Sequence, residues 1–90
     1  MPTISILFGI VIRMFYSDHA PPHFHAQYGE YKAELANRGA IDTLEVIGGS
    51  LPRRTLALVL EWAAVHREEL RTDWELCREH RKPNTIEPLE

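Results

Sequence analysis

The hydrophobic pattern of this 90-residue chain changes near residue 50. Before that point, β-branched and aromatic residues gather in short runs between Gly, Pro and Asn, a pattern typical of strands and turns. After it, apolar residues such as Leu56, Val59, Leu60 and Ala63 recur every three or four positions, as on one face of a helix. Strands followed by helices favour an α+β fold with a small antiparallel sheet.

We expect three to four strands within residues 3–47. The candidate strands are residues 10–16, 23–28, 31–35 and 41–47. The first is apolar on both faces, which predicts a central strand, and Gly9 indicates a bulge or bend before it. Gly29 and Glu30 predict a tight turn that joins the second and third strands into a hairpin.

The helical region is expected over residues 52–82, followed by a tail over 83–90. Its apolar stripe is interrupted by polar residues at His66 and Arg67. The pattern therefore fits either one long helix or two consecutive helices, packed on one face of the sheet. The length of the chain predicts a single domain over residues 1–90.

Charge and composition exclude several classes of protein. The chain is 44% hydrophobic and 26% charged, as in globular domains, and its net charge of −3 argues against a duplex-DNA binder. One cysteine, Cys77, allows no internal disulfide. No run approaches the ~20 apolar residues of a membrane span, and the first residues do not resemble a signal peptide. These features predict a cytoplasmic protein without membrane contact.

The densest chemistry lies in the segment Asp18-His19-Ala20-Pro21-Pro22-His23-Phe24-His25. On a strand, His23 and His25 point to the same face with Cα atoms ~6.5 Å apart, whereas Phe24 points into the core. Two imidazoles at this spacing can converge on one ligand. The segment is therefore the candidate site.

Two chemical interpretations fit these histidines. In the first, His23 and His25 bind a divalent transition metal such as zinc, with His19, Asp18 or Glu30 completing the ligand set. In the second, His23 and His25 act without metal as base and acid on a phosphodiester. Tyr31, Arg13 and Lys32 are then the candidates that stabilise the phosphate.

A purely structural interpretation stands beside both, since histidines near prolines often hold a loop through backbone hydrogen bonds. Arg53 and Arg54 are unfavourably placed for the dipole at the start of a helix. They are candidates for contact with RNA or an acidic partner, or serve solubility alone.

The sequence resembles a family of small bacterial proteins known only as a domain of unknown function. The D-H-x-P-P-H-F-H motif carries most of the resemblance, which extends to the segments Phe15–His25, Tyr28–Tyr31, Leu51–Arg54, Leu60–Trp62 and His66–Leu70. Members are often encoded beside a second short protein, an arrangement like that of a toxin–antitoxin pair, and some are labelled transcriptional regulators. The resemblance implies a small protein partner but no catalytic residues.

Two functions follow. In one, the chain is a toxin–antitoxin-type component that acts on RNA or a nucleotide through His23 and His25. In the alternative, it is a non-catalytic binding or regulatory module that pairs with the neighbouring protein, and its histidines are structural or bind metal. Apolar sheet edges also permit a homodimer.

Overall fold

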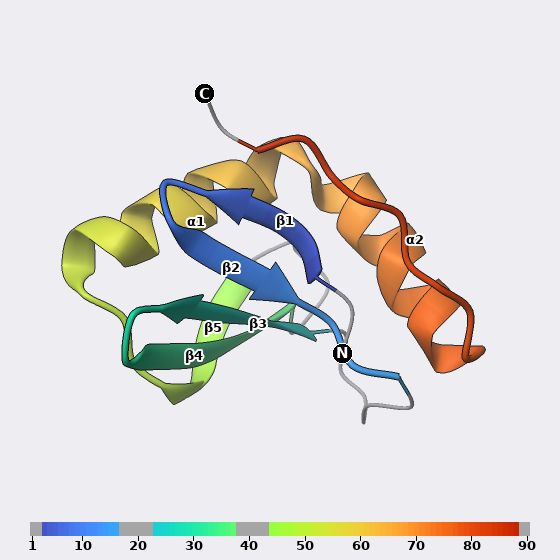
Figure 1. Cartoon of the computed structure of the whole chain (residues 1–90), viewed down its shortest axis with the longest axis horizontal. Coiled ribbons are helices and arrows are strands. Elements are labelled where there is room, and N and C mark those ends of the chain that lie inside the picture. Colours follow the sequence, from blue (N-terminus) through green and yellow to red (C-terminus); the bar gives the residue numbers. More distant parts are fainter. Residues whose placement is uncertain (1–2, 17–22, 38–43, 89–90) are drawn as a thin grey trace.

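The computed structural model describes residues 3–16, 23–37 and 44–88. This part of the chain forms an antiparallel sheet followed by two helices (Figure 1). The elements are β1 Thr3–Leu7, β2 Ile10–Arg13, β3 His23–Tyr28, β4 Tyr31–Asn37, β5 Leu44–Gly49, α1 Arg53–Val65 and α2 Arg67–Arg78. The predicted α+β class is confirmed.

The sheet has five strands in the described residues, so the prediction of three to four was wrong. Their order in space is their order in the sequence, and each neighbouring pair is antiparallel. The additional strand comes from the apolar N-terminal run, which folds into the β1–β2 hairpin. Phe8 and Gly9 form its turn with φ of 49° and 78°, the positive values that a type I′ turn requires.

The β3–β4 hairpin matches the prediction, with Tyr28 paired to Tyr31 across the turn at Gly29 and Glu30. The next strand differs from its prediction at the C-terminal end, because β5 continues through Gly48 and Gly49. Its predicted first residues, 41–43, lie outside the described residues.

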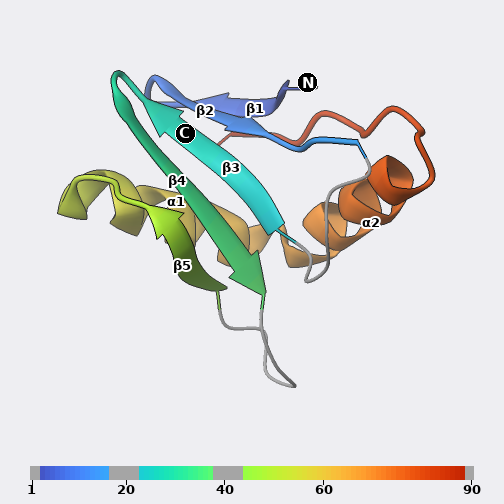
Figure 2. The ribbon, with the colours of Figure 1, turned by 90° about the horizontal axis from the view of Figure 1, so that it is seen from below.

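The core lies between one face of the sheet and the helices. Ile10, Ile12, Phe24 and Leu35 are almost fully buried on this face. The Trp62 ring of α1 meets the Phe24 ring edge to face, with centroids 5.9 Å apart. Figure 2 shows α1 crossing this face of the sheet. Phe24 therefore points into the core as predicted.

The helical region is two helices, separated at His66. Its backbone departs from helical geometry with φ of −111° and ψ of 28°, and its Nδ1 lies 2.6 Å from Glu69 Oε1. In α2, Leu70, Trp74 and Cys77 recur at three and four residues and are buried. Both described helices are too short and too polar to cross a membrane.

The segment after α2 packs back onto β1 and α1. The Ile86 backbone N–H donates to the Ile4 carbonyl over 2.7 Å. Trp62 Nε1 donates to the Glu87 carbonyl over 2.9 Å. Ile86 is buried, as expected if the tail docks onto the body. The segment thus covers part of the β1 edge.

Candidate functional site

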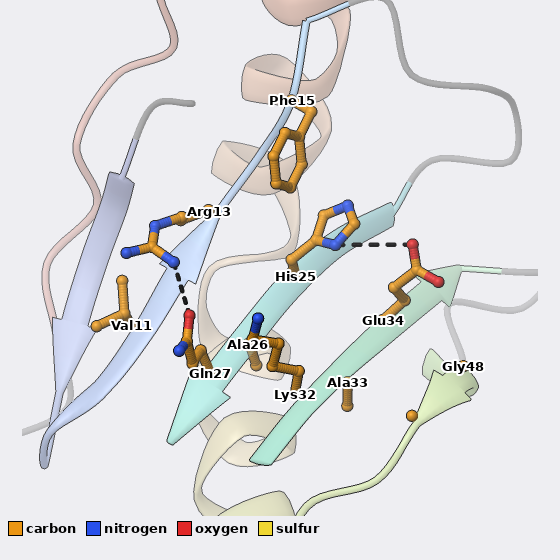
Figure 3. A pocket seen from close by; sticks show the side chains of 11 residues that line it. Val11, Arg13, Phe15, His25, Ala26, Gln27, Lys32, Ala33, Glu34 and Gly48 are labelled. Carbon is orange, nitrogen blue, oxygen red and sulfur yellow. Dashed lines mark hydrogen bonds and ion pairs between the residues drawn. The ribbon is translucent and has the colours of Figure 1, made fainter. Parts of the chain in front are cut away.

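The face of the sheet opposite α1, here called the open face, carries a cavity of about 380 Å³. Polar side chains from three neighbouring strands line it (Figure 3). These are Arg13 of β2, His25 and Gln27 of β3, and Lys32 and Glu34 of β4. Since side chains alternate along a strand, the core residues between them face the other way. The cavity is thus built from the solvent-facing positions of the sheet.

The strand register brings these side chains together. Arg13 of β2 pairs with His25, and His25 pairs with Glu34 of β4. Directly paired residues on one face have Cβ atoms ~5 Å apart. Arg13, His25 and Glu34 therefore form one row across three strands.

His23, His25 and Glu34 each present an atom able to bind a metal. These three atoms lie within 4.8 Å of one another. His25 Nδ1 is 3.6 Å from Glu34 Oε1, and the His23 and His25 rings are 5.3 Å apart between centroids. Among the described residues, this is the group of His, Cys, Asp and Glu side chains close enough to share an ion.

The separation between His25 and Glu34 suits a metal centre. Two ligand atoms at ~2.1 Å from a tetrahedral zinc ion are ~3.4 Å apart, and the observed 3.6 Å is close to that value. His23 is buried and His25 is half-buried, which limits competition from water. The ring of Phe15 packs against His25 edge to face, 4.2 Å between centroids, and restricts its rotation.

The neighbouring end of the cavity is polar and cationic. Arg13 Nη1 donates to Gln27 Oε1 over 2.8 Å, and Gln27 Nε2 donates to the Gly29 carbonyl over 3.3 Å. These bonds hold the guanidinium beside the histidine strand. Lys32 pairs with Gln27 across β3 and β4 and lines the same cavity. The site therefore combines a His–Glu group with two cations.

The other predicted site residues lie elsewhere. Glu30 is exposed in the β3–β4 turn, beyond the Tyr28–Tyr31 pair, which is itself three residue pairs or ~10 Å along the hairpin from His25. Tyr31 follows it on the core-facing side of β4 and is 46% exposed at the turn. Arg53 and Arg54 are exposed in the first turn of α1 and do not line the cavity. Asp18 and His19 lie outside the described residues.

Sequence reasoning missed Glu34 and Gln27. The signal for Glu34 was available, because a two-residue turn at Gly29 and Glu30 pairs Tyr28 with Tyr31 and therefore His25 with Glu34. Gln27 follows from strand alternation, since it shares a face with His25.

Comparison with known proteins assigns the chain to a family by its sequence. No curated protein and no solved structure shows significant similarity to the chain. The model of a domain of unknown function, DUF4160, matches residues 9–75. That range includes β2 to β5, α1 and most of α2, and with them the row of Arg13, His25 and Glu34. The chain belongs to the DUF4160 family.

Proposed function

We propose that the open face binds a divalent transition metal such as zinc through His23, His25 and Glu34, and that this centre hydrolyses a phosphodiester in RNA or a nucleotide. The proposal includes the role that the family resemblance suggests, the active component of a toxin–antitoxin-type pair. The observation that carries it is the mutual approach of two imidazoles and a carboxylate within 4.8 Å.

Three protein ligands leave coordination positions for water and substrate, as in catalytic metal sites. When bound, such a metal supplies a Lewis acid for a phosphoryl oxygen and lowers the pKa of water. Glu34 adds a negative charge to the two neutral imidazoles, and this charge attracts the metal cation. Phe15 fixes the His25 ring, so that its nitrogen is oriented before the metal arrives.

Arg13 and Lys32 are placed to bind the substrate phosphate. Both line the cavity that contains His25 and Glu34. The Arg13 guanidinium is positioned by Gln27 through one of its N–H groups, and its remaining donors can meet phosphate oxygens. Cations beside the reacting phosphate stabilise the charge that develops in the transition state.

A second candidate is metal-free acid–base catalysis, favoured by the approach of Glu34 to His25 Nδ1. In that mechanism Glu34 orients the imidazole, and the other ring nitrogen takes the proton of the attacking hydroxyl. His23 then protonates the leaving oxygen. Activity that survives complete removal of metal would select this mechanism.

The test begins with elemental analysis and zinc titration calorimetry of the purified chain. We expect one zinc ion per chain, removable by chelator, and a weakening of affinity by at least about 100-fold in His25→Ala and Glu34→Gln. Glu30→Gln is the matched control, because it removes the same charge from the same hairpin outside the site. Hydrolysis of labelled RNA and of nucleotides is then measured with and without zinc.

A chain that binds no divalent metal excludes the metal centre. Unchanged hydrolysis in the His25→Ala and Glu34→Gln variants excludes both catalytic mechanisms. A protein that hydrolyses nothing and forms a stable complex with a small protein encoded beside it would instead support the binding or regulatory module.

A further inference from the structure

Three aromatic side chains are exposed at one end of the sheet. They are Phe8 in the β1–β2 turn and Tyr28 and Tyr31 beside the β3–β4 turn, with exposed fractions of 58%, 41% and 46%. We call them the aromatic tip. Figure 2 shows both turns at the same end of the sheet. A Cβ on Gly9 would lie 3.7 Å from the Tyr28 ring, so the two turns lie close together.

Phe8 is strained as well as exposed. Its φ of 49° is in the left-handed region, which costs a bulky L-residue about 1–2 kcal/mol. Type I′ turns favour Asn or Gly at this position. An exposed ring in a strained conformation adds little to the core, so the fold does not explain the phenylalanine. Strained backbone of this kind marks functional positions.

Basic side chains border the aromatic tip. Lys32 follows Tyr31, and the Ser50 N–H donates to the Lys32 carbonyl over 2.9 Å. Arg53 begins α1 three residues after Ser50, within about 11 Å by chain length. It is followed by Arg54, and both are exposed. Figure 1 shows α1 starting at the same end of the molecule as the two turns.

The charge at this end is opposite in sign to the charge of the chain. The three cations Lys32, Arg53 and Arg54 outnumber the two acidic residues near Lys32 in the hairpin, Glu30 and Glu34, by one charge, whereas the whole chain has a net charge of −3. Within the part of the chain that the structure describes, none of these three cations forms an ion pair. They are available to an anionic partner.

We propose that the aromatic tip binds single-stranded RNA, stacking bases on its rings while Lys32, Arg53 and Arg54 contact the phosphates. This proposal rests on the proposed function and names its substrate class as an RNA strand rather than a free nucleotide. Exposed rings beside a cationic track are the general means by which proteins hold single strands.

The distance from the aromatic tip to the candidate centre is one that a single strand of RNA can span. The Tyr28–Tyr31 pair is three residue pairs, or ~10 Å, from the His25–Glu34 pair. Because Tyr28 and Tyr31 lie on the core-facing side of the hairpin and the candidate centre lies on the open face, a strand that joins them passes around the turn and needs more than the three stacked nucleotides that span ~10 Å at 3.4 Å each. Lys32 lies one residue pair from the Tyr28–Tyr31 pair, and Arg13 lies at the other end, in the row of His25 and Glu34. A mononucleotide is too short to reach both, and a duplex hides the base faces that stack on aromatic rings.

The test is fluorescence anisotropy of a labelled eight-nucleotide RNA of mixed sequence, measured with chelator present. Chelator separates binding at the aromatic tip from any metal chemistry. Phe8→Asn is the main variant, because asparagine suits the turn and should raise the unfolding midpoint while removing the ring. Tyr31→Ala and Arg53→Ser/Arg54→Ser complete the set. Val65→Ser removes an exposed apolar side chain from the other end of α1 and serves as the control.

We expect about tenfold weaker RNA binding for Phe8→Asn and for Tyr31→Ala, a smaller salt dependence for the arginine variant, and wild-type binding for Val65→Ser. Full RNA affinity in Phe8→Asn, equal affinity for duplex RNA, or no affinity in the wild-type chain overturns the proposal. A dimer in sedimentation that Phe8→Asn dissociates would assign the aromatic tip to a second copy instead. Zinc binding and nucleotide hydrolysis in a chain without RNA affinity would leave the proposed function standing alone.

Discussion

The carboxyl of Asp73 lies between α2 and the segment that follows it, and only 1% of the residue is exposed. Its Oδ1 accepts the Asn84 backbone N–H over 2.8 Å, whereas its Oδ2 has no hydrogen-bond partner in the described part of the chain. Burial raises the pKa of Asp73 from 3.8 to about 6; the Asn84 bond acts in the opposite direction, and the negative charge of Glu69 adds a smaller increase.

This pKa makes the stability of the fold depend on pH. The folded chain holds the Asp73 proton more tightly than the unfolded chain, so the contribution to stability is complete below pH 3.8 and is lost as pH rises through about 6. A tenfold change in proton affinity is worth about 1.4 kcal/mol, and the full difference is therefore about 3 kcal/mol.

Asp73→Asn should remove this dependence. The amide keeps an oxygen to accept the Asn84 N–H but carries no charge at any pH. Its nitrogen adds unpaired donors at a cost of about 1–3 kcal/mol, and that cost does not change with pH. The free energy of unfolding of the variant minus that of the wild type should therefore rise by about 2.4 kcal/mol between pH 4 and pH 7.5, most of the full difference.

The assay is urea denaturation followed by the fluorescence of Trp62 and Trp74, both buried in the folded chain, at four pH values across that range. Glu68→Gln removes an exposed carboxyl from the same helix and serves as the control for the loss of a charge outside the buried site. Parallel pH curves for the wild type and Asp73→Asn would refute the reasoning, because they would show that Asp73 titrates alike in the folded and unfolded chains.

Four further substitutions test the fold, each through the loss in free energy of unfolding obtained from urea denaturation. Gly49→Ala should cost at least about 2 kcal/mol, because φ is +70° and a Cβ would overlap the backbone of β4. Gly29→Ala, with φ of +59° and open space around it, should cost only about 1 kcal/mol; equal losses would contradict this account. Phe24→Ala should cost about 3–5 kcal/mol from the core, and a loss below 1 kcal/mol would argue against its packing on α1. Trp62→Phe should cost about 2 kcal/mol, including the lost bond to Glu87, and an unchanged midpoint would argue against that bond.

The β3–β4 hairpin could be predicted because its local signals agree. Gly29 supplies a positive φ of 59° in the turn, and the flanking residues favour strands. The same turn fixes the register, so the partner of His25 could have been counted from it. Glu30 is the acidic residue closer to His25 in the sequence, whereas the strand register brings Glu34 closer to it in space.

The β1–β2 hairpin could not be predicted with equal ease. Its turn consists of Phe8 and Gly9, and only the glycine is a turn residue. Phenylalanine normally favours a strand, so the apolar run reads as continuous from Ile4 to Tyr16. Tertiary packing overrides this preference, because β1 buries Ile4 and Leu7 in the core. Burial of two such side chains outweighs the strain of about 1–2 kcal/mol at one turn residue.

The two faces of β3 separate the stability of the fold from its proposed chemistry. Phe24 and Ala26 are buried against the core, whereas His25 and Gln27 line the cavity on the open face. Because the core face fixes the backbone of β3, the row on the open face is positioned without contributing much to stability. His25→Ala and Glu34→Gln should therefore unfold within about 1 kcal/mol of the wild type. If these variants lose metal binding or RNA hydrolysis, the loss can then be assigned to the missing side chain and not to unfolding.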